Sequence, residues 1–350
     1  MRLLPLLLAA LVIGCDTPPA DDLAPPRPRG DRTLALDVTA ADGEDFDRAV
    51  TAARDLGATA LSLTQAWAIL ETAPGQFAPE TDFLDIANTY YPTRDMAVAL
   101  KLPSVDTNVD QRPADLRDTP WDAPEMAARY RALLTYAASR TPDLDVSHVV
   151  LGNEVDIFFG DDRAGHAAYR TFIASVIDHA RGLWPEAVVG TVVTFDGATG
   201  LRADEAAAIQ ALGDAALVTY YPLDDGFQVR EADTVGRDVA RLLDRLGGEV
   251  HLMEAGTPTG RETDGSEADQ ADFVEALFDA WDAHADRVPY LSYSFLTDFP
   301  EASVSEFEAY YGISDPAFLS YLGTLGLRTA SGQEKPAYEV FATEAAARGW

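Results

Sequence analysis

From Thr33 onward, short apolar runs alternate with longer amphipathic stretches. The runs are rich in β-branched and aromatic residues and end in polar or turn-forming residues, a pattern typical of strands buried on both faces. Eight such runs begin near Leu34, Ala60, Ala97, His148, Val188, Leu217, Val250 and Tyr290. Between them, apolar residues recur at helical spacing, notably over 45–56, 123–139, 164–183, 231–246 and 267–284.

This alternation predicts an α/β protein with a parallel sheet, and eight repeats predict a closed (β/α)₈ TIM barrel. A doubly wound sheet is the alternative, but it calls for a glycine-rich phosphate turn after the first strand. Here the first strand runs into Asp37-Val-Thr-Ala-Ala-Asp-Gly43 instead. No second-domain linker is visible, so we expect one barrel domain over residues 32–350, with a short C-terminal extension.

The N-terminus has the pattern of a targeting segment. Arg2 precedes an apolar stretch, 3–13, that is too short to span a bilayer but suits a signal peptide. The stretch ends at Val12-Ile13-Gly14-Cys15, which resembles a bacterial lipobox. The resemblance implies a signal peptide over 1–14, lipidation of Cys15 and a lipid anchor in the bacterial cell envelope, facing the periplasm or the cell surface. Residues 15–31 are proline-rich and predict a tether.

Two other observations bear on this segment. Cys15 is the only cysteine, so an intramolecular disulfide is excluded and a lipid anchor would explain its presence. The alternative is an ordinary secretory signal that contains an incidental cysteine.

The charge balance excludes some classes of partner. The formal net charge is −32, with 58 acidic against 26 basic residues. Nucleic acids and anionic lipid surfaces are bound through basic patches, so neither is an expected partner, and the lipid anchor would be the only membrane contact. An acidic, solubilising surface is the simplest interpretation, and we expect a monomer. Only two residues, Lys101 and Lys335, are lysines.

Two strand-like segments each carry a glutamate at the carboxyl end. The first runs from Val146 to Gly152-Asn153-Glu154, and the second is Val250-His-Leu-Met-Glu254. A buried strand tolerates a carboxylate only where the chain leaves the core. A TIM barrel gathers these strand ends on one face, where its active sites are built. A pair of glutamates there suggests acid/base and nucleophilic chemistry on a glycosidic bond.

With the strands counted as above, Glu154 follows strand four and Glu254 follows strand seven. This arrangement resembles clan A of the glycoside hydrolases, in which an Asn-Glu pair after strand four supplies the acid/base and a glutamate after strand seven the nucleophile. The resemblance covers roughly residues 33–345. Its further elements are Trp67-Ala-Ile-Leu-Glu71-Thr-Ala-Pro-Gly75-Gln-Phe77, Val218-Thr-Tyr220-Tyr221-Pro222, Ser266-Glu-Ala-Asp-Gln270-Ala-Asp-Phe273 and Gly332-Gln-Glu-Lys335-Pro-Ala337.

The resemblance implies a retaining hydrolase of β-glycosidic bonds in poly- or oligosaccharides. Glu154 would then be the acid/base and Glu254 the nucleophile, with the carboxyl groups about 5–5.5 Å apart. Asn153 would contact the sugar 2-hydroxyl, and Tyr220 or Tyr221 would hold the nucleophile ionised. Period-2 alternation lets only one of these tyrosines point inward.

Further substrate contacts are expected from aromatic and polar residues near strand ends. They are Trp67 after strand two and, after strand eight, Phe295 and Asp298. The five histidines show no zinc spacing, so no metal or other cofactor is expected.

Six aspartates also fall at predicted strand ends: Asp37, Asp106, Asp156, Asp196, Asp224 and Asp298. One interpretation is that they cap the helices that follow. The other is a negative cleft that repels uronic-acid polymers and favours neutral or amino sugars.

The chain departs from the clan pattern at two positions. Several members carry an arginine near the end of strand two, where this chain has Leu61-Ser-Leu-Thr-Gln65. Many place a tryptophan at the end of strand eight, where this chain has Ser294-Phe295. These departures keep open a non-catalytic carbohydrate-binding lipoprotein on a degenerate TIM barrel. A barrel hydrolase or lyase unrelated to sugars is a further alternative, because a fold does not fix a function.

Overall fold

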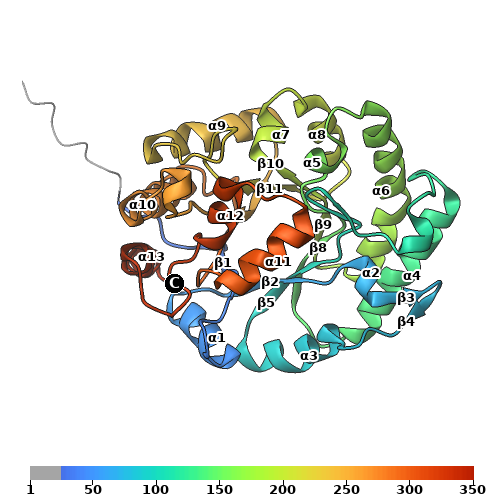
Figure 1. Cartoon of the computed structure of the whole chain (residues 1–350), viewed down its shortest axis with the longest axis horizontal. Helices are drawn as coiled ribbons and strands as arrows, with labels where there is room; N and C mark the ends of the chain where they lie inside the picture. The colour runs from blue at the N-terminus through green and yellow to red at the C-terminus, as the bar shows by residue number, and fades with distance from the viewer. Residues whose placement is uncertain (1–24) are drawn as a thin grey trace, which may run out of the picture.

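A computed structural model describes residues 25–350 as a parallel β-barrel surrounded by helices (Figure 1). The sheet order is β10-β11-β12-β13-β1-β2-β5-β8-β9, and every neighbouring pair is parallel. The barrel strands are β1 (Thr33–Leu36), β2 (Ala60–Thr64), β5 (Ala97–Lys101), β8 (Val146–Val150), β9 (Val188–Gly190), β10 (Val192–Thr194), β11 (Ala216–Tyr220), β12 (Val250–Ala255) and β13 (Tyr290–Tyr293). All eight expected strand positions are therefore confirmed, and with them the TIM-barrel fold class.

The fifth barrel strand is divided into two, β9 and β10, with only Thr191 between them. β9 pairs with β8, and β10 pairs with β11. Backbone hydrogen bonds continue across the break: Leu151 N donates to Gly190 O (2.9 Å), and Val192 N donates to Gly152 O (2.8 Å). The two ends of the sheet thus meet, which leaves no free edge in the ring.

Side chains alternate between the inside and the outside of the barrel. A small inner cluster takes a side chain from each of the eight strand positions and adds Ala215, which lies just before β11; the strand members are Ala35, Ala60, Ala99, Val150, Val192, Leu217, Met253 and Tyr290. A much larger apolar cluster fills the space between the strands and the helices. Because alternation has period 2, the residues two and four positions beyond the inner cluster face the mouth of the barrel.

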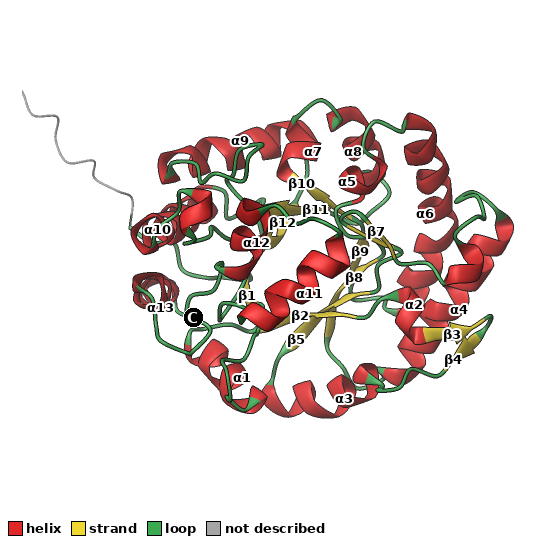
Figure 2. Cartoon of the chain, viewed as in Figure 1, coloured by secondary structure: helices red, strands yellow, loops and turns green. Residues whose placement is uncertain are grey.

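Helices cover the outside of the barrel (Figure 2). The five expected amphipathic helices are confirmed as α1 (Phe46–Asp55), α4 (Pro124–Arg140), α6 (Arg163–Leu183), α9 (Val235–Leu246) and α10 (Glu267–Ala283). The other helices are α2 (Trp67–Leu70), α3 (Phe83–Tyr90), α5 (Val155–Phe159), α7 (Phe195–Thr199), α8 (Ala203–Gln210), α11 (Glu301–Tyr311), α12 (Pro316–Gly323) and α13 (Pro336–Arg348). Short 3-10 helices span Tyr91–Arg94, Ala114–Leu116, Ala232–Thr234 and Arg261–Thr263.

Local sequence explains where several helices begin. Asp45, Asp162 and Ser266 precede α1, α6 and α10, and each side chain accepts a hydrogen bond from a backbone N–H of the first turn. Such a cap satisfies a donor that has no partner inside the helix. The capping residue thus fixes the position at which each helix begins.

Two small hairpins and the helix pair α11–α12 are additions to the eight strand–helix units of the barrel. One hairpin is β3 (Glu71–Ala73) with β4 (Gln76–Phe77), and the other is β6 (Val105–Asp106) with β7 (Val109–Asp110). α11 and α12 lie between β13 and α13 in the chain, and α11 is drawn across the barrel in Figure 1. The β6–β7 hairpin and the pair α11–α12 lie on the face of the barrel that carries the strand ends.

The N-terminal predictions fall mostly outside the described residues. Cys15, the expected signal peptide over 1–14 and most of the tether lie there. The last tether residues contact the outer helices α10 and α13: Arg27 N donates to Asp282 Oδ2 (2.8 Å), and Arg29 N donates to Arg348 O (2.7 Å). No helix within 25–350 is both long and apolar enough to cross a membrane.

Two buried histidines face each other inside the barrel, His148 from β8 and His251 from β12. Nε2 of His148 lies 2.7 Å from Nδ1 of His251. Burial lowers the pKa of His251 to about 4. For His148, burial and then the neighbouring His251 and Lys101 lower the pKa well below its usual value. Both rings are therefore neutral in the native state at neutral pH.

We predict that this pair makes the fold acid-sensitive. An unfolded histidine binds a proton below about pH 6.5, whereas the native pair resists protonation, so stability falls as pH drops from about 6.5 towards 4. For His251 the loss is on the order of 3 kcal/mol. Thermal melts should show a smaller loss over this range for His251→Asn, whereas His179→Asn, at a partly exposed helical position, should match the wild type. Equal losses in all three proteins would contradict the prediction.

Candidate active site

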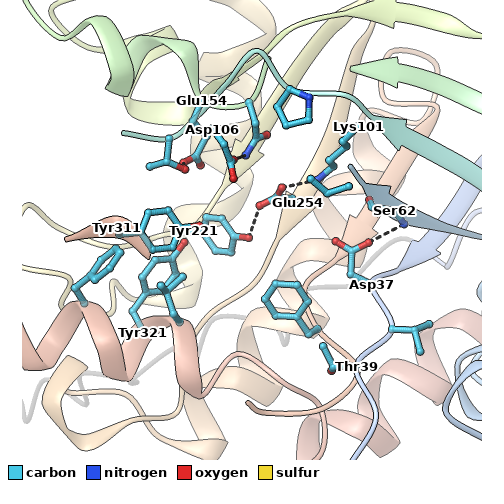
Figure 3. Close-up of a pocket in the computed structure, with 18 residues that line it drawn as sticks. Asp37, Thr39, Ser62, Lys101, Asp106, Glu154, Tyr221, Glu254, Tyr311 and Tyr321 are labelled. Carbon is cyan, nitrogen blue, oxygen red and sulfur yellow. Dashed lines mark hydrogen bonds and ion pairs between the residues drawn. The ribbon is translucent and has the colours of Figure 1, made fainter. Parts of the chain in front are cut away.

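A cavity of about 280 Å³ opens among the carboxyl ends of the barrel strands. Its polar lining includes both glutamates of the strand-end motifs, Glu154 and Glu254, as Figure 3 shows. A second cavity, of about 220 Å³, shares Glu154 with the first and is lined mainly by apolar side chains. The residues common to both are Thr107, Glu154, Tyr221, Phe318 and Tyr321.

Strand alternation explains how most polar residues reach the first cavity. Asp37 and Thr39 lie two and four residues beyond the inner-cluster residue Ala35, and Ser62 and Thr64 stand in the same relation to Ala60. The same relation links three further cavity residues to the inner cluster: Lys101 to Ala99, and Thr219 and Tyr221 to Leu217. The inward face of each strand thus continues from an apolar core into a polar mouth.

Glu254 reaches the cavity through an irregularity in β12. Val218 of β11 pairs with Leu252, but the next residue, Thr219, pairs with Glu254, so Met253 is an extra residue. Such a bulge re-aims the side chains that follow it. As a result Met253 belongs to the inner cluster while Glu254, directly after it, lines the cavity.

The Glu254 carboxylate has two close partners. Lys101 Nζ donates to Oε1 (2.5 Å), and the Tyr221 hydroxyl donates to Oε2 (2.8 Å). Burial alone would lower the pKa of Lys101. The negative charges of Glu254 and Asp37, the hydrogen bond to Glu254 and the charge of Asp106 raise it overall. Burial raises the pKa of Tyr221 well above its usual value, so its hydroxyl keeps its proton and donates. Both contacts favour an ionised Glu254.

Glu154 lies in a different environment. Thr219 Oγ1 donates to its Oε1 (2.7 Å) and Thr107 Oγ1 to its Oε2 (2.8 Å), and no cation contacts it among the described residues. Burial, followed by the negative charge of Glu254, raises the pKa of Glu154 to about 8. Glu154 therefore holds a proton at neutral pH while Glu254 carries a charge, which is the division of roles that acid/base and nucleophilic chemistry requires.

Three residues that line the two cavities have left-handed backbones. Thr107, Glu154 and Phe227 have φ values of 52°, 46° and 60°. This conformation is uncommon for residues other than glycine and costs on the order of 1–3 kcal/mol at each position. Such strain gathers at functional sites because the surrounding structure holds side chains where function needs them.

Asn153 and Asp106 form the wall beside Glu154. Asn153 Nδ2 donates to Asp106 Oδ1 (3.0 Å), and the Tyr310 hydroxyl donates to Asp106 Oδ2 (2.6 Å). The Tyr169 hydroxyl lies close to Gly152, which precedes Asn153. A Cβ atom at position 152 would be only 2.1 Å from that hydroxyl. Glycine is thus required for the chain to pass this point before it turns into the Asn-Glu pair.

The structure brings together some of the expected site residues. Glu154, Glu254, Asn153, Tyr221 and Phe295 all line the first cavity. The choice between the two tyrosines is settled by alternation, since Tyr221 is on the inward side and contacts Glu254.

Three expected substrate contacts lie outside the lining of both cavities. Tyr220 points outward and donates to Asp238 Oδ2 (3.0 Å), as alternation requires of the residue before Tyr221. Trp67 is fully buried and donates through Nε1 to Glu71 Oε2 (2.7 Å). Asp298 is paired with Lys335 Nζ (2.8 Å). Strand geometry turns Tyr220 away from the cavities. Trp67 bonds to Glu71 of its own motif, and Asp298 bonds to Lys335 of the C-terminal element 332–337.

The motif elements around Trp67 and Lys335 therefore serve packing. Glu71 also accepts hydrogen bonds from Gly75 N (2.6 Å) and Arg129 Nε (2.6 Å), which ties the β3–β4 hairpin to α4. Gln270 is buried and donates to the carbonyls of Thr257 and Leu325 (both 3.0 Å).

The six strand-end aspartates divide between several roles. Asp37 and Asp106 line the first cavity, and Asp196 and Asp224 line the second. Asp156 is buried and accepts from Thr194 N (2.8 Å) and its hydroxyl (2.7 Å). None of the six is the N-cap of a helix in the described chain, so the capping interpretation is wrong and four of them contribute to a negative cleft.

Lys101 is the main site residue that the sequence interpretation missed. It occupies the carboxyl end of β5 and supplies the cation that an arginine near strand two was expected to provide. A signal was present, because Lys101 is one of only two lysines and ends the apolar run Ala97-Val-Ala-Leu-Lys101. The residues of α11 and α12 that line the cavities, which include Tyr311, Phe318 and Tyr321, were also missed.

The described residues hold no group of three or more histidine, cysteine, aspartate or glutamate side chains placed to bind a metal ion.

No protein-family model and no curated protein matches this chain. Solved structures do resemble it. A GH5_18 protein from Bifidobacterium longum subsp. longum, in complex with Manb1-4GlcNAc, superposes with a TM-score of 0.70 at 14% identity, over 90% of this chain and 78% of that one. The exo-beta-1,4-mannosidase Op5Man5 from Opitutaceae bacterium strain TAV5 superposes with a TM-score of 0.70 at 16% identity, over 91% of this chain and 59% of its own.

Xylanase 10B from Thermotoga maritima superposes with a TM-score of 0.65 at 13% identity, over 91% of this chain and 96% of that one. At such identities the likeness shows that the chain has the (β/α)₈ barrel fold of these proteins. It does not by itself carry their activities over.

We predict that Glu154→Gln raises thermal stability, and more so at higher pH. An unfolded glutamate ionises above about pH 4.3, whereas native Glu154 keeps its proton up to about pH 8, so wild-type stability falls as pH rises through this window. Glutamine removes this penalty, and we expect the gain in Tm to reach about 2 °C or more by pH 8. Calorimetry at pH 5 and pH 8 would measure it, with the exposed Glu249→Gln as the control. A gain that does not grow with pH would contradict the assignment.

Proposed function

We propose that this protein is a retaining glycoside hydrolase that cleaves β-glycosidic bonds in oligo- or polysaccharides. The observation that carries the proposal is the pair of glutamates in one cavity: Lys101 and Tyr221 keep Glu254 ionised, while burial keeps Glu154 protonated. Retaining hydrolysis needs one carboxylate to attack and one carboxylic acid to donate a proton.

In the first step, an oxygen of Glu254 attacks the anomeric carbon, and the bond from that carbon to the leaving oxygen breaks. Glu154 gives its proton to the leaving oxygen, so the aglycone departs as an alcohol and Glu254 is left in a glycosyl ester. In the second step, Glu154, now ionised, takes a proton from water, whose oxygen displaces Glu254 from the same carbon. The product keeps its anomeric configuration, and both glutamates return to their starting states.

The neighbouring residues support these roles. Lys101 stabilises the charge of Glu254 before attack and as it leaves in the second step. Asn153, held by Asp106, stands beside Glu154 and is suited to bind the 2-hydroxyl of the reacting sugar. The three solved structures named above come from proteins whose names include a mannosidase and a xylanase, which favours a glycan as the substrate.

The non-catalytic alternative was motivated by two missing residues. In this cavity a cation contacts Glu254 through Lys101, and an aromatic ring from the end of strand eight is present as Phe295. Both departures are therefore matched by residues of similar chemistry, so we favour catalysis over binding alone.

Trapping the glycosyl-enzyme tests the proposal. A panel of dinitrophenyl 2-deoxy-2-fluoro-β-glycosides (glucosyl, mannosyl, galactosyl and xylosyl) should include one that inactivates the protein. The fluorine slows both steps, while the good leaving group speeds the first, so the ester accumulates. Mass spectrometry should find one added glycosyl group on the peptide that contains Glu254, and none in Glu254→Gln. Modification of a different residue, or no turnover of any glycoside, would contradict the proposal.

The two lysines provide a matched pair of variants. Each is a buried partner of one carboxylate, Lys101 of Glu254 in the cavity and Lys335 of Asp298 outside it. Because removing one partner leaves a buried charge, both Lys101→Met and Lys335→Met should lose about 3–5 kcal/mol of stability. Only Lys101→Met should also lose kcat/KM, by about 100-fold or more, measured at a temperature where both variants are folded. Equal losses of activity would show that Lys101 acts through stability alone.

A further inference from the structure

The pair α11–α12 forms a strap, residues 301–323, across the mouth of the barrel. The strap leaves the rim after β13 and returns to the chain that leads to α13, and Figure 1 shows α11 lying across the barrel strands. α11 has no buried residue, so most of its surface faces solvent. α11 is thus an exposed element that spans the cavities, whereas α12 buries Phe318 and Gly323.

The far end of α11 is fastened to the opposite rim, at the β6–β7 hairpin. The Tyr310 hydroxyl donates to Asp106 Oδ2 (2.6 Å), and Asn108 Nδ2 donates to the Tyr311 carbonyl (2.8 Å). Gln111 also donates to the Tyr310 hydroxyl. These bonds join residues about 200 positions apart in the chain, so they close the strap over the site.

The near end of the strap is held by other contacts. The rings of Phe295 and Phe299 lie 4.9 Å apart, and Phe299 and Phe307 lie 4.8 Å apart. Behind α12, Thr259 N donates to the Thr324 carbonyl (3.1 Å). The strap is therefore attached at both ends.

The underside of the strap forms an aromatic roof over the catalytic pair. Tyr321 packs against Tyr221 (5.2 Å between ring centroids) and stacks with Phe227 (6.0 Å, 15° between planes). Tyr311 packs edge-on against Phe318 (5.5 Å). Tyr311 and Tyr321 are drawn beside Tyr221 in Figure 3.

The two cavities extend in different directions from beneath this roof. The first reaches the ends of β1 and β2, at Asp37, Thr39 and Thr64. The second reaches the ends of β10 and β11, at Asp196 and Asp224. They meet at Glu154 and Tyr221, below Phe318 and Tyr321 of the strap. A glycan chain that occupies both cavities must therefore pass under the strap at the bond to be cut.

From this arrangement we propose that the enzyme acts at chain ends: a glycan enters the space under the strap by its end, and the interior of a long chain is excluded. The inference rests on the proposed function and adds the mode of action. An open groove would accept a chain laid in from above, whereas a fastened strap admits only a terminus. The lining of the two cavities is acidic: it includes Asp37, Asp106, Asp196 and Asp224, and Lys101 is the single lysine or arginine among the lining residues. An acidic lining favours neutral or cationic chains over uronic acids.

The first test is the position of the initial cut. Tetra-, penta- and hexasaccharides of β-1,4-linked mannose, xylose, glucose and glucosamine, each labelled at the reducing end, would be digested to a few per cent and sized. A chain-end enzyme releases a fragment of one size from one end, whatever the length of the substrate. Internal cuts that spread or move towards the middle as the chain grows would overturn the inference while leaving the proposed function intact. No cleavage of these chains or of the aryl glycosides above would overturn the proposed function itself.

The second test loosens the strap. The double variant Tyr310→Phe, Asn108→Ala lacks hydrogen bonds that fasten α11 to the β6–β7 hairpin. Loss of one such bond shifts the equilibrium between the fastened and the released strap by about 5-fold. The fraction of internal cuts on the hexasaccharide should rise by about that factor or more. Tyr136→Phe is the matched control, because its hydroxyl makes a similar bond to Asp82 (2.6 Å) on the outer helices, and its product pattern should match the wild type. An unchanged pattern in the strap variant would overturn the role of the strap.

Discussion

The ion pair between Lys101 and Glu254 is the interaction on which the site depends. The first cavity gathers four carboxyl groups, Asp37, Asp106, Glu154 and Glu254, and one amino group. Burial raises the pKa of Asp37, Asp106 and Glu154, so a negative charge on any of these three carboxyl groups is costly. By contacting Glu254 directly, Lys101 stabilises the negative charge of that carboxylate. That charge in turn helps to keep Glu154 protonated, so a single contact creates two chemically different glutamates.

Barrel geometry makes this contact possible. Lys101 and Glu254 are 153 positions apart in the chain and come from the third and seventh strands of the ring. Inward-facing positions repeat every second residue, so the apolar layer of Ala35, Ala99 and Leu217 continues directly into Asp37, Lys101 and Thr219. The bulge at Met253 is the one adjustment that β12 needs to aim Glu254 at the same point. Glu154 and Thr107 hold the acid in place with left-handed backbone conformations, which raise the local conformational free energy.

The sequence was sufficient to predict the eight strands, the barrel and the meeting of Glu154 with Glu254, because those features follow from hydrophobic periodicity and strand order. It could also state that only one of Tyr220 and Tyr221 points inward, but not which, since the phase of alternation depends on where β11 begins. It could not separate motif residues that pack, such as Trp67 and Asp298, from those that line the cavity, because both kinds lie beside strand ends. The partners of Lys101 and of the strap could not be predicted, because they lie in distant segments of the chain, as Tyr310 and Asp106 do. The place of Lys101 at the end of an apolar run marks it as a candidate site residue but does not identify Glu254 as its partner.

The central claim is that the two glutamates carry different protonation states at neutral pH because of each other and of Lys101. The most direct test is an NMR titration of protein labelled with ¹³C at the glutamate carboxyl carbons, with the Glu154 signal assigned by its absence in Glu154→Gln. The account predicts that Glu154 titrates near pH 8 in the wild type and at a lower pH in Glu254→Gln, where the neighbouring charge is gone. A Glu154 signal that titrates near pH 4.3, or one that does not respond to the loss of Glu254, would contradict it.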